Sequence, residues 1–200
     1  MITIVDYGLG NLGSVLNMMK KVGVPAQVTG DLDTISKAEK ILLPGVGAFD
    51  PAMEKLTGTE LRKVLDKKAK EEKVPVLGIC LGMQLLTRGS EEGELEGLGW
   101  IPSYTYKFPQ TELKVPHMGW NLVKRNVPSP LTDEFDDEFR FYFVHSYYVK
   151  ADSDQHSILR TQYGVNFDSG IQYENIFGAQ FHPEKSHRFG MQLFRNFAKI

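Results

Sequence analysis

The sequence predicts a single α/β domain in which helices cover both faces of a parallel sheet. In the first half, short apolar runs alternate with segments whose apolar residues recur at helical spacing, as in a parallel sheet with crossover helices. In the second half, strand candidates are separated by Gly, Pro, Asn and Asp, which adds a β-rich portion. The length suits one domain over residues 1–200, and no repeat or linker divides the chain.

Apolar periodicity places each element. Residues 2–6 form a strand-like apolar run, and a helical pattern follows from Leu12. A helix with a lysine-rich face is expected within 56–69, another helix begins near Leu81, and a last helix lies at 189–197. The other expected strands are 26–29, 40–43, 74–79, 100–108, 121–126, 138–150, 156–163, 170–173 and 176–181.

Composition excludes several classes of protein. Lys and Arg number 23 against 25 Asp and Glu, so the net charge of −2 disfavours nucleic acid or an anionic membrane as a partner. The longest apolar stretch, 74–86, is too short to cross a bilayer. No export signal is visible at the N-terminus, so we expect a cytoplasmic protein. The single cysteine, Cys80, allows no internal disulfide and no cysteine-rich zinc site.

A glycine pattern near the N-terminus raises the possibility of a nucleotide site. In "YGLGNLGS" (7–14), three glycines have the G-x-G-x-x-G spacing that lets a backbone approach a pyrophosphate, and Asp31 lies where a ribose-binding acid belongs. However, Asp6 and Tyr7 come between the apolar residues 2–5 and the first glycine, and Asn11 is better suited to cap the next helix. A glycine-rich β-to-α turn is the alternative. The glycines are Gly8, Gly10 and Gly13.

Cys80 lies in a nucleophile-elbow pattern. The segment "GICLG" (78–82) has the form G-x-C-x-G, in which small flanking residues allow a cramped strand-to-helix turn that exposes the nucleophile. The N-terminus of a helix favours a thiolate, and the N–H of Leu81 would face a developing oxyanion. The alternative is that Cys80 is a small buried apolar residue, as free cysteines most often are.

One histidine has a carboxylate close in sequence. His182 and Glu184 are separated by Pro183 at the end of an apolar strand, so both side chains are expected on one face of an extended segment. With Cys80, they predict a thiolate nucleophile, an imidazole base and an orienting carboxylate. The alternative is a structural His–Glu pair. The histidines considered are His117, His145, His156, His182 and His187.

These motifs resemble those of the class I (triad) glutamine amidotransferases, which combine a G-x-C-x-G-x-Q elbow with a C-terminal H-P-E. More narrowly, the chain resembles the family of glutaminase subunits of imidazole glycerol phosphate synthases, over nearly its whole length. The matching segments are "IVDYGLGNL", "LLPGVGAF", "GICLGMQLL", "SEEG", "PHMGWN", "FYFVHSYY" and "GAQFHPEKS".

The resemblance implies a flavodoxin-like three-layer α/β/α fold with a central mixed sheet and additional antiparallel strands. It implies that Cys80 attacks the side-chain amide of glutamine, giving a γ-glutamyl thioester and ammonia, after which water releases glutamate. His182 and Glu184 complete the triad, and the N–H groups of Val46 and Leu81 form the oxyanion hole. No cofactor and no metal are implied.

The resemblance also implies a glutamine-binding site. Glu92 would meet the α-ammonium, and backbone groups at 145–147 would meet the α-carboxylate. Without the resemblance, "SEEG" would be interpreted as a solvated acidic turn and "PGVG" as a glycine turn after the third strand. The expected glutamine-binding residues are Gly45, Gly47, Gln84, Glu92, His145, Ser146 and Tyr147.

A partner chain is expected, because ammonia in water near neutral pH is mostly ammonium, which lacks the lone pair for attack. The resemblance implies a heterodimer with a (β/α)8 barrel that makes imidazole glycerol phosphate and aminoimidazole carboxamide ribotide in histidine biosynthesis. From spacing alone, Trp120 could instead be a core residue and His117 a hydrogen-bonded loop residue. The expected interface residues are Asn11, His117, Met118, Trp120, Asn121 and Lys185.

Three other functions stay open on the sequence. Gly13 and the segment 87–89 depart from the family pattern, so a paralogous glutaminase that supplies ammonia for sugar amidation in surface-polysaccharide synthesis is one alternative. A free-standing cysteine hydrolase of γ-glutamyl substrates is the second. The third is a non-enzymatic nucleotide-binding module.

Overall fold

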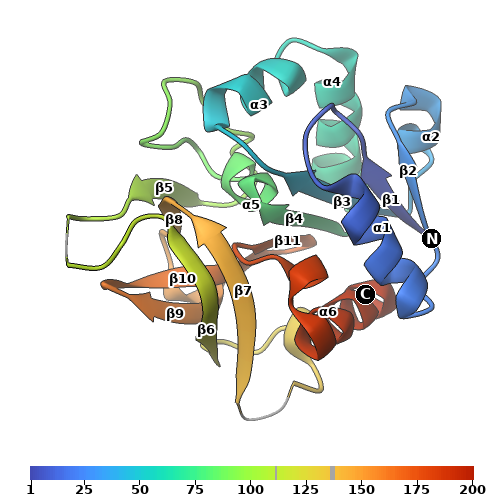
Figure 1. Ribbon diagram of the computed structural model, residues 1–200. Coiled ribbons are helices and arrows are strands. Elements are labelled where there is room, and N and C mark those ends of the chain that lie inside the picture. The colour runs from blue at the N-terminus through green and yellow to red at the C-terminus, as the bar shows by residue number, and fades with distance from the viewer. Residues whose placement is uncertain (111, 136–137) are drawn as a thin grey trace.

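A computed structural model describes residues 1–110, 112–135 and 138–200. Within these residues, a nine-stranded mixed sheet in the order β2-β1-β3-β4-β11-β10-β9-β6-β7 forms the centre (Figure 1). The parallel half consists of β1 (Ile2–Val5), β2 (Ala26–Thr29), β3 (Lys40–Gly45), β4 (Val76–Cys80) and β11 (Ile176–Ala179). The antiparallel half consists of β6 (His117–Arg125), β7 (Phe139–His145), β9 (Ser157–Tyr163) and β10 (Val165–Tyr173). A separate antiparallel pair consists of β5 (Ser103–Lys107) and β8 (Tyr147–Ala151).

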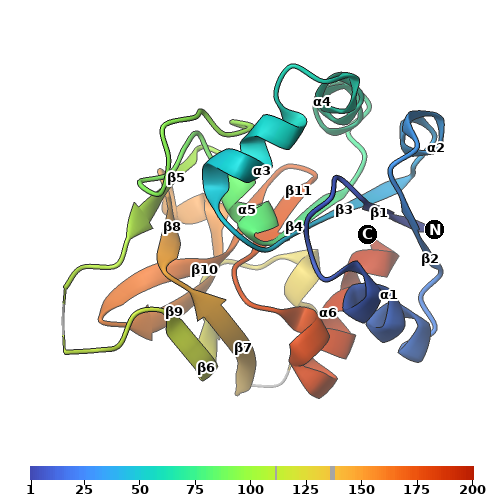
Figure 2. The ribbon, with the colours of Figure 1, turned by 45° about the horizontal axis from the view of Figure 1, so that its top comes forward.

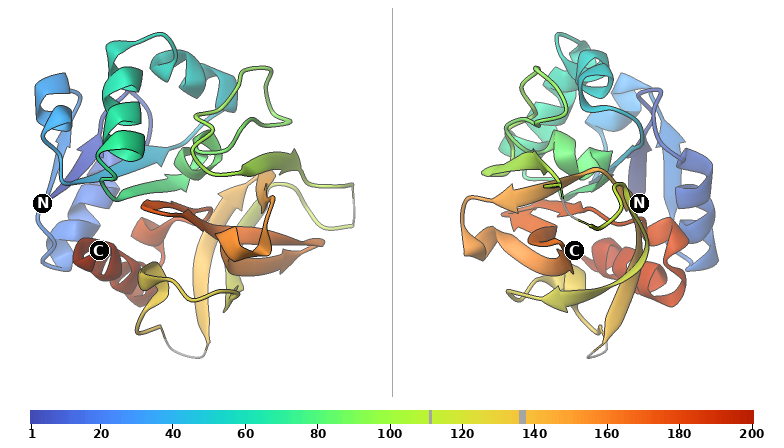
Figure 3. Two further views of the ribbon diagram at one scale, coloured as in Figure 1. Left: turned by 180° about the vertical axis from the view of Figure 1, so that it is seen from behind. Right: turned by 60° about the vertical axis from the view of Figure 1, so that its left-hand side comes forward.

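Helices cover both faces of the parallel half, which makes the fold three-layered (Figure 2). The antiparallel strands extend away from the side on which both termini lie (Figure 3). One face carries α1 (Leu12–Lys21) and α6 (His187–Lys199). The other carries α2 (Leu32–Ser36), α3 (Phe49–Leu56), α4 (Glu60–Asp66) and α5 (Leu81–Leu85), and a π-helical turn, Lys67–Glu71, continues α4.

Two hydrophobic cores lie on opposite faces of the sheet. Within β3, Leu42 joins the core under α1 and α6, whereas Ile41 and Leu43 join the core under α3 to α5. This division follows from the strand, because successive side chains point to opposite faces. The predicted α/β class with a flavodoxin-like three-layer arrangement, a central mixed sheet and added antiparallel strands is therefore confirmed.

Most predicted elements are present, with four corrections. Strand β10 begins at Val165, five residues earlier than predicted. The range 138–150 contains two strands, because the chain leaves the large sheet at Ser146 and β8 pairs instead with β5. Strand β6 begins four residues earlier than predicted and runs through Gly119, which looks like a turn residue and has φ of +117°. Helices α2 and α3 were not expected. Helix α2 has only five residues, whereas α3 has eight, and its buried residues have a helical spacing that the sequence analysis missed: Phe49, Ala52, Met53 and Leu56.

The N-terminal glycine loop is a β-to-α turn. Asn11 caps α1 by accepting from the N–H of Ser14, and Asp31 caps α2. A Cβ at Gly13 would meet nothing within 4 Å, whereas the third glycine of a dinucleotide fingerprint is needed for close helix–strand packing. These contacts favour the turn over the nucleotide-binding alternative.

No helix among the described residues is both long and apolar enough to cross a membrane.

Candidate active site

Cys80 lies on a strained turn between β4 and α5. Its φ of 54° and ψ of −111° are unusual for a residue other than glycine, and such strain is common at functional sites. A Cβ at Gly78 would lie 2.6 Å from the Gly82 carbonyl oxygen, and a Cβ at Gly82 would lie 1.9 Å from that of Leu43. Both flanking positions therefore require glycine, and the predicted elbow geometry is confirmed.

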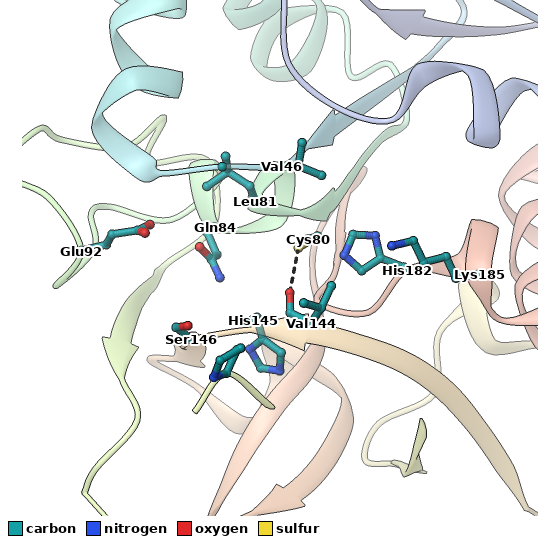
Figure 4. Close-up of a pocket in the computed structure, with 12 residues that line it drawn as sticks. Val46, Cys80, Leu81, Gln84, Glu92, Val144, His145, Ser146, His182 and Lys185 are labelled. Atoms are coloured by element: carbon teal, nitrogen blue, oxygen red, sulfur yellow. Dashed lines mark hydrogen bonds between the residues drawn. The ribbon is translucent and has the colours of Figure 1, made fainter. Parts of the chain in front are cut away.

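The sulfur of Cys80 lies on the floor of a pocket, and the residue is 8% exposed. Sγ is 3.9 Å from the Val144 carbonyl oxygen and 4.0 Å from Nε2 of Gln180. Figure 4 shows the His182 ring beside the sulfur. The thiol therefore has three polar groups around it: an imidazole, a carbonyl oxygen of β7 and the amide of Gln180, which directly follows β11.

His182 and Glu184 form a buried pair. The Nδ1–H of His182 donates to Oε1 of Glu184 at 2.8 Å, and the side chains are 4% and 2% exposed. His182 itself has the extended backbone that the sequence predicted, but the segment after it does not stay extended. Pro183–Lys185 forms a 3-10 turn, which brings the carboxylate back to the ring more closely than an extended strand would.

The pKa of His182 is displaced upward. Burial by itself disfavours the imidazolium, but the hydrogen bonds and negative charges of Cys80 and Glu184 outweigh this and raise the pKa to about 10. With Nδ1 bound to Glu184, the Nε2 side of the ring is the one available to Cys80. The three residues form the arrangement that nucleophilic catalysis by cysteine needs.

The pocket has a volume of about 320 Å³. It brings together most of the predicted residues. Gly45, Tyr147 and Glu184 are not among its lining residues, whereas Lys185, predicted for the interface, lines the pocket. Its lining is Val46, Gly47, Cys80, Leu81, Gln84, Glu92, Pro116, Val144, His145, Ser146, His182 and Lys185.

The glycine loop after β3 borders the nucleophile. Gly45 is paired with Cys80 across β3 and β4, and Val46 is 42% exposed. The hydroxyl of Tyr7 donates to the Pro44 carbonyl at 2.6 Å, which anchors the start of the loop. The loop is therefore next to the sulfur, as the oxyanion prediction requires, whereas the role of its N–H groups stays a prediction.

Gln84 lies on α5, one turn after the nucleophile. Its Nε2 donates to the Tyr147 carbonyl at 3.2 Å and to Oε1 of Gln180 at 3.1 Å. Both amide N–H groups are used in this way, so the Gln84 oxygen is left to accept a hydrogen bond in the pocket.

Glu92 is not the solvated residue that composition alone suggests. It is half-buried in the pocket wall, and its Oε2 accepts from the N–H of Phe49 at 3.0 Å. Burial raises the pKa of its carboxyl, the Phe49 hydrogen bond lowers it, and the neighbouring Asp50 raises it. Asp50 in turn accepts from the N–H groups of Glu94 and Leu95, which ties this loop to the start of α3.

The junction between β7 and β8 forms the opposite wall. β7 ends at His145 and β8 begins at Tyr147, so Ser146 is exposed to the pocket at the point where the chain changes sheets. The ring of His145 turns inward, where its Nδ1 lies 2.7 Å from the Tyr147 carbonyl oxygen. The predicted glutamine-binding segment is therefore at the pocket.

Side chains of β6 alternate between two faces. Met118 and Trp120 are 61% and 44% exposed, and Trp120 stacks on His187, so the core alternative for Trp120 is wrong. His117 is buried and hydrogen-bonded within the strand, and Asn121 is half-buried beside it. The predicted interface residues of β6 thus divide into an outward apolar pair and an inward polar pair.

The remaining two predicted interface residues lie on other elements. Asn11 is exposed at the start of α1. Lys185 is exposed at the pocket, with its Nζ 5.6 Å from the centre of the Tyr142 ring. Figure 4 shows it beside His182.

Three residues at the site were not predicted from the sequence. Pro116 and Val144 line the pocket, and Gln180 contacts both Gln84 and Cys80. Gln180 is two residues before His182, so a polar residue within an apolar strand was an available signal. Pro116 and Val144 carry no chemical signal, because only the fold brings them to the pocket.

Comparison with known proteins agrees with this geometry. The model of the family "Glutamine amidotransferase class-I" matches residues 3–200, and the chain belongs to this family. Within it, the chain groups with the HisH subunits of imidazole glycerol phosphate synthases. It is 52% identical to imidazole glycerol phosphate synthase subunit HisH 2 of Methanococcus maripaludis, with coverage of 100% of this chain and 99% of the relative.

Two further similarities agree with this placement. The chain is 46% identical to subunit HisH 2 of Pseudomonas aeruginosa, over 100% of both chains. A solved structure described as a glutamine amidotransferase has a TM-score of 0.76 at 14% identity, over 100% of both chains, which shows a shared fold.

Proposed function

We propose that this chain hydrolyses glutamine through a Cys80–His182–Glu184 triad and supplies the ammonia to a synthase subunit in histidine biosynthesis. The observation that carries the proposal is the position of the Cys80 sulfur on a strained elbow, beside an imidazole that a buried carboxylate orients. The resemblance to HisH subunits supports glutamine as the substrate.

The chemistry follows from the protonation that the site favours. The thiolate of Cys80 attacks the amide carbon of glutamine, and the imidazolium of His182 gives its Nε2 proton to the leaving nitrogen, so that ammonia departs and a γ-glutamyl thioester remains. His182 then takes a proton from water, which attacks the thioester and releases glutamate. The N–H groups of Val46 and Leu81 stabilise the oxyanion, and each such donor is worth about 100- to 1,000-fold in rate.

Glutamine binding is assigned to groups around the pocket. The carboxylate of Glu92 receives the α-ammonium, and backbone groups at Ser146 and Tyr147 receive the α-carboxylate. The amide nitrogen of Gln84 is already used in two hydrogen bonds, so its side-chain oxygen is the group that accepts a hydrogen bond from glutamine. The loop of Gly45 and Gly47, and the backbone of His145, complete the binding site.

The partner is a (β/α)8 barrel subunit that uses the ammonia, and the complex is a heterodimer. The outward apolar face of β6 supports a docking surface there, because Met118, Trp120 and Leu122 are 61%, 44% and 48% exposed. Asn11 and Lys185 are assigned to its rim, and His117 and Asn121 to its inner side. A cytoplasmic location stays a prediction.

Reconstitution tests the proposal. The purified chain is mixed with a candidate barrel subunit, and glutamate is measured with and without the acceptor substrate of the barrel. We expect glutamate formation that depends on the partner. Strong glutamine turnover by the chain alone would instead indicate a free-standing cysteine hydrolase.

The HisH names of the relatives favour the histidine-pathway partner over a sugar-modifying synthetase. Copurification with a sugar-modifying synthetase, and no glutamate formation with the barrel, would indicate the polysaccharide alternative.

A further inference from the structure

Two buried histidines whose side chains the proposed reaction does not use face each other across β6 and β7. His117 and His145 are opposite residues in the antiparallel register, and they are 2% and 5% exposed. Nδ1 of His117 lies 2.9 Å from Nε2 of His145. Burial lowers the pKa of His117 to about 4 and that of His145 to about 3, so both rings are neutral near pH 7. The rings of Phe108, Phe143, Tyr163 and Phe167 surround the pair.

The groups at the two ends of this hydrogen-bonded chain determine which ring nitrogen donates and which accepts at each step. At one end the Tyr147 carbonyl can only accept, so the Nδ1 of His145 carries the proton, and its Nε2 is an acceptor. His117 therefore donates from Nδ1 and accepts at Nε2, which receives the amide N–H of Asn121 at 3.1 Å. The Asn121 amide is itself oriented, because its nitrogen also donates to the Gln162 carbonyl at 3.1 Å. Both histidines thus hold the Nδ1–H tautomer.

The chain continues to the nucleophile. The Tyr147 carbonyl that accepts from His145 also accepts from Nε2 of Gln84. Gln84 donates its second amide hydrogen to Gln180, whose Nε2 lies 4.0 Å from the Cys80 sulfur. The position of one backbone carbonyl therefore connects the histidine pair with the orientation of the Gln84 amide.

We propose that Asn121, His117 and His145 form a positioning relay that holds the Tyr147 carbonyl, and through it the Gln84 amide, in the orientation that binds glutamine. The relay touches no reacting atom, so it acts on substrate affinity through Gln84. This inference rests on the proposed glutaminase function, because it assigns the effect to the glutamine pocket.

The variant Asn121→Asp tests the relay with little change of shape. A carboxylate cannot donate, so a neutral His117 ring places its proton on Nε2, and its Nδ1 lone pair then faces the lone pair of Nε2 of His145. In the complex with the barrel subunit, we expect the KM for glutamine to rise about five- to tenfold, the effect of about one hydrogen bond. Because Asn121 is also assigned to the inner side of the docking surface, the KM is measured at a saturating concentration of the barrel subunit. A KM that returns to the wild-type value at saturation would indicate a docking effect and overturn the relay.

The control is Asn166→Asp, which adds the same charge at an exposed position of the groove that Asn121 also lines. We expect this variant to keep the wild-type KM. Equal KM values for the two variants would overturn the relay.

The tautomers provide a test that does not depend on catalysis, and its wild-type part does not depend on the folding of a variant. The ¹⁵N imidazole shifts of the full chain should report Nδ1–H for His117 and His145 in the wild type, and Nε2–H for His117 in Asn121→Asp. An Nε2–H tautomer of either ring in the wild type would overturn the relay. A wild-type complex that forms no glutamate would contradict the proposed function instead, and the tautomers would still decide the relay.

Discussion

Nδ1 of His182 and Oε1 of Glu184 lie 2.8 Å apart, and both side chains are almost wholly buried. Because the carboxylate fixes one ring nitrogen, the other nitrogen is directed to the Cys80 side of the ring. Oε2 of Glu184 is buried and has no hydrogen-bond partner among the described residues, so within them the carboxylate is held by the contact of its Oε1 with His182. The raised pKa of His182 follows from this pairing and from the sulfur.

The substitution Glu184→Gln should keep the shape of this pair and remove its charge. We expect kcat for glutamine hydrolysis in the complex to fall by roughly 1,000- to 10,000-fold, as in other triads whose orienting carboxylate is made neutral. The pKa of His182, followed by NMR titration, should fall. An unchanged kcat in a folded variant would show that Glu184 has only a structural role.

The substitution Cys80→Ala should separate the two activities of the complex. Glutamine-dependent synthesis should disappear because no nucleophile remains, whereas synthesis from added ammonium salts should continue. The two rates are measured on the same preparation of the complex. Loss of both activities would contradict the catalytic assignment and indicate a role in folding or docking.

The substitution Glu92→Gln should weaken glutamine binding, because it removes the carboxylate proposed to meet the α-ammonium. We expect KM to rise about tenfold or more, since hydrogen bonds to charged groups are worth about 1.5 to 3 kcal/mol. Glu91→Gln is the matched control, because Glu91 is exposed and its carboxylate accepts from the Lys107 N–H outside the pocket. Similar KM values for both variants would contradict the assignment.

Two glycine-to-alanine substitutions should have opposite effects on stability. In Gly82→Ala, the added methyl group would lie 1.9 Å from the Leu43 carbonyl oxygen, and we expect a loss of about 3 kcal/mol in the free energy of unfolding. In Gly13→Ala, the methyl group meets open space within α1, and we expect a gain of about 0.5 to 1 kcal/mol. Urea unfolding measures both. A stable Gly82→Ala variant would contradict the close packing of the elbow.

The free energy of unfolding should depend on pH, and the buried histidines should contribute in two opposite ways. The pKa values of His117 and His145 are lowered to about 4 and about 3, so between these values and 6.5 the unfolded chain binds protons that the folded chain does not. His117 and His145 therefore lower the free energy of unfolding as the pH falls below 6.5. The raised pKa of His182 has the opposite sign, so its stabilising effect is complete below pH 6.5 and is lost as the pH rises through about 10.

Urea unfolding between pH 7 and pH 4 measures the acid effect. The variant His117→Gln should lose stability less steeply than the wild type over this range, because one titrating group is gone. Parallel curves for the two proteins would contradict the lowered pKa of His117.

Local patterns predicted the parallel half of the fold well. The expected strands at 2–6, 26–29, 40–43 and 74–79 correspond to β1 to β4, because an apolar run bounded by turn residues is a local property of the chain. The second half was harder, since β7 and β8 form one continuous β-prone segment and only their different pairing partners separate them.

The sequence by itself determined the α/β class, the elbow that carries Cys80 and the nearness of His182 to Glu184, because each depends on residues within one short segment. The tertiary structure decided which residues face the sulfur. Gln180, Val144 and the His117–His145 chain come together through strand pairing and burial, which join residues far apart in the chain, and no local pattern contains that information.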